Sequence, residues 1–173
     1  LAQGDYLPFW QDTDGDYLSD WWELRYFGSD TNVNAAAGSD PDGDSWTNQA
    51  EFLDNTDPNN AASFPTPPTV IVAPLEPFQS VRPAWTVSAT ITDNLSVESA
   101  YLIWREKDEA DWHTDEMTWV EGNTYSGLLD PPSHGAERVD YYIYAADLLG
   151  FYYPEFGTFS PVYSVIGDYE DPW

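Results

Sequence analysis

Two stretches of twelve residues near the start of the chain repeat one spacing of acidic side chains. The first runs from Asp12 to Glu23 and the second from Asp40 to Glu51, 28 residues further on. In both, acids occupy positions 1, 3 and 5, an oxygen-bearing residue occupies position 9, and Glu occupies position 12. Alternate residues of a tight loop can direct three carboxylates at one point, so this spacing constrains the local fold strongly.

The spacing is that of an EF-hand calcium loop. Ca²⁺ is a hard cation that takes 6–8 oxygen ligands at about 2.3–2.6 Å, and the loop supplies them from positions 1, 3, 5, 7, 9 and 12. Position 7 contributes a backbone carbonyl, and the Glu at position 12 binds with both oxygens. A single D-x-D-G-D run could equally be an Asp-rich turn, but two runs with matching ligand positions indicate two Ca²⁺ sites.

Both stretches depart from the EF-hand loop at position 6, where that loop carries Gly at a sharp turn. Position 6 is Tyr17 in the first stretch and Ser45 in the second, and Gly stands instead at position 4, as Gly15 and Gly43. A non-Gly residue at positive φ costs roughly 1–2 kcal/mol. We therefore expect these loops to be looser than an EF-hand loop, or wound differently.

A short helix is predicted to begin at position 9 of each stretch, directly after a residue suited to cap it. The expected elements are Ser19, helix Asp20–Phe27 and Gly28, then Thr47, helix Asn48–Leu53 and Asn55. The Glu at position 12 would then lie in the first helical turn, where it can close the ligand shell of the preceding loop.

Residues 10–64 resemble the calcium-binding repeats of secreted bacterial proteins, of the thrombospondin type 3-like or dockerin-like EF-hand kind. The runs DTDGDYLSDWWELRYFG and DPDGDSWTNQAEFLDNTDPNNAASF carry this resemblance. In such families two loop–helix units pack against each other, and each binds one Ca²⁺. The resemblance assigns ligand roles to Asp12, Asp14, Asp16, Leu18 (carbonyl), Asp20, Glu23, Asp40, Asp42, Asp44, Trp46 (carbonyl), Asn48 and Glu51.

The chain changes character after a proline-rich stretch, 58–68, which we expect to act as a stiff linker. Beyond it, apolar and polar residues alternate with the period of half-buried strands. Seven strands are expected: Thr69–Ala73, Val87–Thr92, Ser99–Arg105, Trp112–Val120, Thr124–Leu129, Arg138–Ala146 and Thr158–Val165. The predicted domains are 1–66, a calcium-binding region with an N-terminal aromatic arm, and 67–173, a β-sandwich with a C-terminal aromatic tail.

Seven short strands with regular turns in about 100 residues predict an immunoglobulin-like β-sandwich. Residues 68–166 resemble the immunoglobulin-like or fibronectin type III-like modules of secreted bacterial proteins, through TVSATITDNLSVESAYLIWRE, MTWVEGNTYSGLL and VDYYIYAADLLG. That resemblance implies a fold rather than an activity. The expected fold class is mainly β: a small calcium-binding loop–helix pair plus a seven-stranded immunoglobulin-like β-sandwich.

The charge of the chain limits its partners. Asp and Glu number 31 against 5 Lys and Arg, for a formal net charge of −26. Too few cations are present to contact the phosphates of a nucleic acid, and no apolar run reaches the roughly 20 residues that span a bilayer. Two bound Ca²⁺ ions would reduce the charge to −22. Cys is absent, so calcium would replace disulfides as the cross-link of the fold.

No catalytic arrangement is evident in the sequence. His113 and His134 are expected at the surface, and no nucleophile stands beside either in a known arrangement. One acidic cluster could hold a weak third cation, whereas its hairpin loop would make a poor cleft for paired-carboxylate glycosidase chemistry. Its members are Glu106, Asp108, Glu109, Asp111, Asp115 and Glu116. We therefore expect no enzyme activity.

We expect a secreted protein of the cell surface, its signal peptide removed, because a strongly acidic chain without Cys suits surroundings rich in divalent cations. The expected function is that of a calcium-stabilised structural or interaction protein, self-assembling into a surface layer or fibre or binding another extracellular protein. Aromatic residues at both chain ends favour assembly. Two alternatives stay open: an accessory module of a secreted hydrolase, serving as a spacer or binding polysaccharide, and a dockerin-like adaptor for a protein receptor.

Overall fold

The structure, a computed structural model, describes residues 11–80, 84–133 and 137–168. The chain divides into two compact units, Leu1–Thr66 and Pro67–Trp173. The aromatic arm expected at residues 1–10, the aromatic tail expected beyond Asp168, and His134 lie outside the described residues. In the part of the chain that is described, no helix is both long and apolar enough to cross a membrane.

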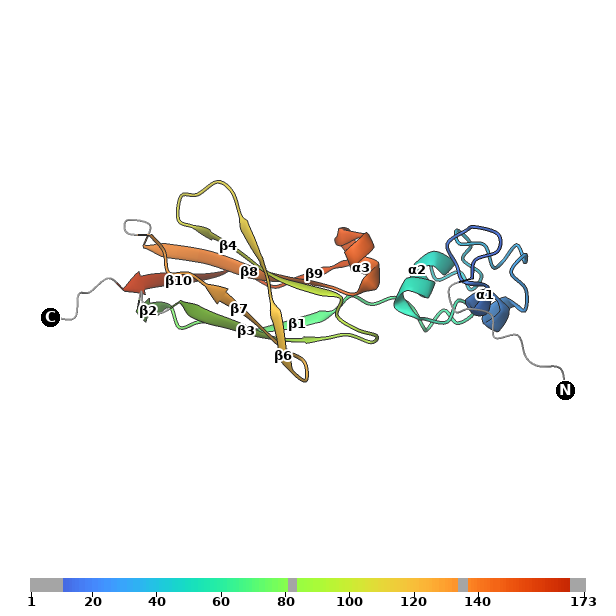
Figure 1. Cartoon of the computed structure of the whole chain (residues 1–173), viewed down its shortest axis with the longest axis horizontal. Helices are drawn as coiled ribbons and strands as arrows, with labels where there is room; N and C mark the ends of the chain where they lie inside the picture. Colours follow the sequence, from blue (N-terminus) through green and yellow to red (C-terminus); the bar gives the residue numbers. More distant parts are fainter. Residues whose placement is uncertain (1–10, 81–83, 134–136, 169–173) are drawn as a thin grey trace. The chain divides into compact units, whose positions relative to one another are not determined.

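The first unit contains two short helices, each preceded by an acidic loop (Figure 1). α1 spans Asp20–Phe27 and α2 spans Asn48–Asp54, so both predicted helices are confirmed, the second with one additional residue. The predicted caps are also confirmed: Ser19 and Thr47 at the N-termini, Gly28 and Asn55 at the C-termini. Local cap residues therefore determine where these helices begin and end, because each cap satisfies backbone groups that the helix leaves unpaired.

The core of the first unit is small and mostly aromatic. Trp22 is 2% exposed, and its ring centroid lies 5.1–5.7 Å from those of Tyr26, Phe27 and Phe52. Leu18 and Ala35 of the same unit are also fully buried. A core below about 70–80 residues rarely supplies more than about 3–5 kcal/mol without a disulfide or a metal. A further cross-link, such as a bound metal ion, would therefore add substantially to the stability of this unit.

The proline-rich stretch is not a linker over its whole predicted length. Pro58 and Pro65 are buried, and residues up to Thr66 belong to the first unit. The side-chain amide of Asn59 donates to the carbonyl of Tyr26 at the end of α1, at 3.2 Å. Prolines here stiffen a turn that packs on the helices, so the expectation of a linker from residue 58 was wrong, and the boundary between units falls at Pro67.

The second unit is a sandwich of two β-sheets (Figure 1). One sheet has the strand order β1-β3-β7-β6, and the other has the order β2-β10-β8-β4-β5, with β9 paired to β8. The strands are β1 Thr69–Ala73, β2 Phe78–Ser80, β3 Trp85–Thr92, β4 Ser99–Glu106, β5 His113–Glu116, β6 Thr118–Glu121, β7 Thr124–Leu129, β8 Arg138–Ala146, β9 Thr158–Phe159 and β10 Tyr163–Asp168. This is the strand arrangement of an immunoglobulin-like sandwich, and the predicted mainly-β fold class is confirmed.

Alternation along the strands builds the core between the sheets. In β3, Val87, Ala89 and Ile91 are buried while the residues between them point outward. They pack in one cluster with buried residues of β4 and β8, among them Leu102 and Ile143, which are fully inaccessible to solvent. The two sheets therefore share one apolar interior, as the period of two predicted.

Two of the predicted strands are each divided. Segment 112–120 forms β5 in one sheet and β6 in the other, with Met117, 5% exposed, at the crossing. Segment 158–165 forms β9 and β10, because Ser160 exchanges two hydrogen bonds with Ile143 (2.8 and 2.9 Å) and the following Pro161 has no N–H to donate. The short elements β2, α3 (Leu148–Tyr152) and η1 (Pro154–Phe156) were not predicted.

Candidate metal centre

The two acidic loops share their internal hydrogen bonds, position by position. In each, the carboxylate at position 1 accepts from the backbone N–H groups of positions 4 and 6. These bonds join Asp12 to Gly15 (2.7 Å) and Tyr17 (3.0 Å), and Asp40 to Gly43 (2.8 Å) and Ser45 (3.0 Å). The carboxylates at positions 3 and 5 accept from the N–H two residues further on in both loops. The repeat in the sequence is therefore also a repeat in the structure.

Backbone strain is repeated as well. Tyr17 has φ of 75° and Ser45 has φ of 85°, so both occupy the left-handed region that favours Gly. Gly15 and Gly43 also have positive φ, at 79° and 78°. Each loop therefore keeps the positive φ of an EF-hand loop at position 6 and adds a second at position 4. The non-Gly residues cost roughly 1–2 kcal/mol each, which the rest of the loop must offset.

Three carboxylates converge in each loop. Asp12, Asp14 and Asp16 each bring one oxygen to within 4.8 Å of the others, and Asp40, Asp42 and Asp44 do the same. Desolvation, followed by the neighbouring charge of Asp16, raises the pKa of Asp14, and desolvation likewise raises the pKa of Asp42. The structure thus gathers oxygens that repel one another unless a cation lies among them.

The glutamates at position 12 add buried charge to each cluster. Glu23 in α1 and Glu51 in α2 are fully buried. Among the described residues, neither oxygen of Glu23 has a hydrogen-bond partner, and the same is true of Oε2 of Glu51. Burial first, and then the aspartates of its own loop, raises the pKa of each glutamate to about 8. A buried carboxylate is costly unless it is paired or binds a metal, so these oxygens favour a cation.

The residues predicted to act at position 7 lie where each loop enters its helix. Leu18 is fully buried, and its N–H donates to Asp16 at 3.0 Å. Trp46 repeats this contact with Asp44 at 2.8 Å. Each bond fixes the peptide group that joins positions 6 and 7, so the backbone leads into position 7 in the same way in both loops.

The two position-9 residues have different partners. Asp20, 3% exposed, accepts hydrogen bonds from the N–H and the hydroxyl of Thr13, both at 2.7 Å. Asn48, fully buried, donates to backbone carbonyls of the segment that connects the loops. Pro41 stands where Thr13 stands in the first loop and has neither an N–H nor a hydroxyl, which explains the difference. No role for Thr13 was predicted from the sequence. The difference at position 2 of the two stretches, Thr13 in one and Pro41 in the other, was a signal that could have indicated it.

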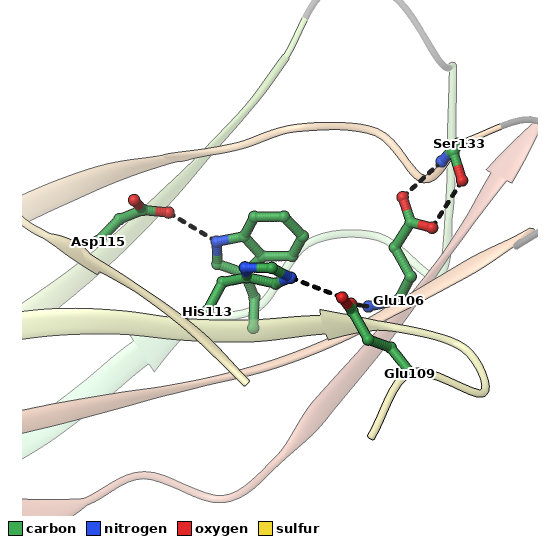
Figure 2. A network of polar contacts seen from close by, with 6 residues as sticks. Glu106, Glu109, His113, Asp115 and Ser133 are labelled. Atoms are coloured by element: carbon green, nitrogen blue, oxygen red, sulfur yellow. Dashed lines mark hydrogen bonds and ion pairs between the residues drawn. The ribbon is translucent and has the colours of Figure 1, made fainter. Parts of the chain in front are cut away.

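Figure 2 shows why the acidic cluster of the β4–β5 hairpin differs from the loops. Three of its carboxylates have separate partners: Glu106 bonds Ser133 (2.7 and 2.6 Å), Glu109 bonds His113 (2.8 Å), and Asp115 bonds the Trp104 indole N–H (2.6 Å). The bond from His113, and then that from the Glu106 N–H, lowers the pKa of Glu109. His113 is exposed, as predicted. The hairpin carboxylates do not converge as those of the loops do, so the structure does not support a third cation site there.

No protein-family model matches the chain, and a search of curated proteins finds no match. A functional conclusion therefore depends on the geometry of the two acidic loops.

Proposed function

We propose that the first unit binds two Ca²⁺ ions, one in each acidic loop, and that the ions hold this unit folded. The proposed ligands are the residues that the sequence analysis names, at positions 1, 3, 5, 7, 9 and 12 of each loop. Among the described residues, the buried carboxylate of Glu23 without a hydrogen-bond partner is the observation that carries the proposal. No group among the described residues forms a hydrogen bond with this carboxylate, and a divalent cation would compensate its charge.

The chemistry of the ligands favours Ca²⁺ over other cations. Each loop offers carboxylate and carbonyl oxygens and neither imidazole nor thiolate, which suits a hard cation. Mg²⁺ demands near-ideal octahedral geometry and keeps several waters, whereas Ca²⁺ accepts 6–8 oxygens in a flexible shell. A glutamate held in the first turn of a helix suits bidentate binding of the larger ion.

Within the whole chain, we infer an extracellular, non-enzymatic role as a calcium-stabilised structural or interaction protein. Absence of Cys leaves metal ions as the available cross-link, and binding free energy then becomes folding free energy. This role implies that the partner is a second copy of the chain or another extracellular protein. A dockerin-like adaptor would use the same two loops, and capture by a cohesin-type receptor would distinguish it.

Calorimetry of the full chain tests the proposal directly. Titration with Ca²⁺ is expected to give two ions per chain and to raise the melting temperature of the first unit, with Mg²⁺ far weaker. Glu23→Gln and Glu51→Gln should each lose one ion, whereas Glu121→Gln, an exposed residue of β6, serves as the matched control. Sedimentation with and without Ca²⁺ then tests self-association. A wild-type chain that takes up no Ca²⁺ would refute the proposal.

A second candidate function is binding of a neutral polysaccharide through the sandwich. Three aromatic residues near the β8–β9 connection are more than half exposed: Phe151 at 51%, Tyr152 at 61% and Phe159 at 57%. Exposed aromatic rings can stack on the apolar faces of sugars, and an accessory module of a secreted hydrolase would use them so. A glycan array probed with the wild-type chain and with Phe151→Ala/Tyr152→Ala/Phe159→Ala tests this, and equal signals from both would exclude these rings.

A further inference from the structure

We propose that the two cation loops are energetically coupled, and that Asn48 is the positioning residue that couples them. This inference rests on the proposed binding of Ca²⁺ to both loops. It concerns the segment 34–39, which runs between α1 and the second loop and which no ligand pattern singles out.

One residue of this segment is bonded to elements of both loops. The N–H of Ala37 donates to Oδ2 of Asp16, the position-5 carboxylate of the first loop, at 2.7 Å. The carbonyl of the same Ala37 accepts from the N–H of Gln49, in the first turn of α2, at 3.0 Å. A predicted ligand of the first loop is therefore held by a residue that is itself held by the helix of the second.

Asn48 fixes the connecting segment to α2. Its side-chain amide donates to the carbonyls of Asn34 at 2.7 Å and Ala36 at 2.9 Å, and its backbone N–H donates to the carbonyl of Ser39 at 2.8 Å. Ala35, between the two clamped carbonyls, is fully buried, as is Asn48 itself. These bonds leave the segment little freedom to move independently of α2.

The cation of the second loop would act on the first through this connection. Glu51 follows Asn48 by three residues on α2, so the two side chains lie on one face of the helix. An ion that fixes Glu51 fixes the N-terminal turn of α2, and with it Asn48, the connecting segment and the donor to Asp16. Linkage makes the effect reciprocal, so an ion in the first loop must favour the second equally.

Within residues 11–80, which the structure describes, the first loop has no counterpart to these Asn48 bonds. Asp20, at the equivalent position 9, bonds Thr13 within its own loop. Asn48 therefore supplies the side-chain bonds of the connection, beside the backbone bonds of Ala37 and Ser39, and a change there should weaken the coupling while leaving the ligands of the first loop in place.

The test is a binding cycle on the full chain, with Ca²⁺ as the probe. Asp40→Asn/Glu51→Gln silences the second loop and Asp12→Asn/Glu23→Gln silences the first, so calorimetry gives each one-ion constant. The coupling factor is the wild-type two-ion constant divided by the product of these constants. We expect a factor of about 5 or more, within the usual range of coupling, falling below about 2 when all three proteins also carry Asn48→Ser. If Asn48→Ser does not fold in saturating Ca²⁺, the same coupling factor is measured with Asn48→Ala in its place.

The outcomes separate the two proposals. A wild-type chain that binds no Ca²⁺ refutes the proposed function itself. Two ions bound with a coupling factor near 1 leave the function intact and overturn the coupling. A factor that is unchanged by Asn48→Ser and by Asn48→Ala overturns the role of Asn48.

Discussion

Tyr17 and Ser45 occupy the same position in the two acidic loops and share one strained backbone conformation, with φ of 75° and 85°. Each donates its N–H to the first carboxylate of its loop, Asp12 or Asp40, at 3.0 Å. Two side chains as different as a phenol and a hydroxymethyl group are thus held in a region that both disfavour. The loop, rather than either side chain, imposes the conformation.

Replacing Tyr17 by Gly should therefore stabilise the first loop. Gly adopts positive φ without the steric cost of Cβ, and the Tyr17 side chain is 79% exposed, so little packing is lost. We expect a gain of about 1 kcal/mol in the unfolding free energy of the Ca²⁺-bound unit. Tyr17→Ala is the control, since it removes the ring and keeps Cβ. Equal stability of the Gly and Ala variants in denaturant titrations would contradict this account.

Metal removal should act on one unit only. Binding to the folded state at an ion concentration 100 times the Kd stabilises by about 2.7 kcal/mol per site. A chelator should therefore lower the melting temperature of the first unit and leave the sandwich unaffected, because the acidic loops lie within residues 11–66. Far-UV circular dichroism, which follows helix and sheet at different wavelengths, checks this. A sandwich that melts together with the loops in chelator would argue against it.

Without metal, stability of the first unit should fall as the pH rises. The pKa of Glu23 and Glu51 is raised to about 8 in the folded chain, from an ordinary value of 4.5. Between these values the folded state holds more protons than the unfolded state, so raising the pH favours unfolding. In chelator we expect a lower melting temperature at pH 9 than at pH 6.

A double variant provides the control for this pH dependence. Glu23→Gln/Glu51→Gln should show a flat profile over the same range, since Gln does not titrate. A wild-type profile in chelator as flat as that of the double variant would disprove the assignment of the pH dependence to these two glutamates.

Tyr141 should contribute to the sandwich independently of calcium. Its hydroxyl accepts from the N–H of Leu75 at 3.0 Å, and its ring stacks on Tyr163 at 5.5 Å. Tyr141→Phe keeps the ring and leaves that N–H without its acceptor, at a cost of about 1–2 kcal/mol. The variant should denature earlier with unchanged Ca²⁺ affinity. Tyr142→Phe, the next residue on β8 and on its other face, is the matched control, and an equal loss there would contradict the assignment.

The helices and their caps were predictable because capping is local. The side chains of Ser19 and Thr47 accept hydrogen bonds from the N–H groups of Trp22 and Ala50, three residues further on, so a short stretch of sequence contains the whole interaction. Strands such as β3 were predictable for the same reason, since its alternation of period two is visible within the strand itself. The crossing at Met117 was not, because it depends on which sheet each half of the segment joins.

The role of Asn48 in the structure could not be predicted either. Its partners are backbone carbonyls of Asn34 and Ala36, and a carbonyl has no residue identity to recognise. The ligand pattern predicts only that position 9 carries a side-chain oxygen. In the structure, the amide nitrogen of that side chain donates the two hydrogen bonds. Contacts between a side chain and distant backbone need the fold before they can be found.

Met117, where the chain crosses from one sheet to the other, also determines how susceptible the protein is to oxidation. The chain has no Cys and a single Met, so this residue carries its only sulfur atom. Met117 is 5% exposed, within the interior that the two sheets share. Susceptibility to oxidation follows exposure, and the folded sandwich encloses the one atom that peroxide would attack most readily. The crossing of the strands thus gives the protein chemical durability along with its shape.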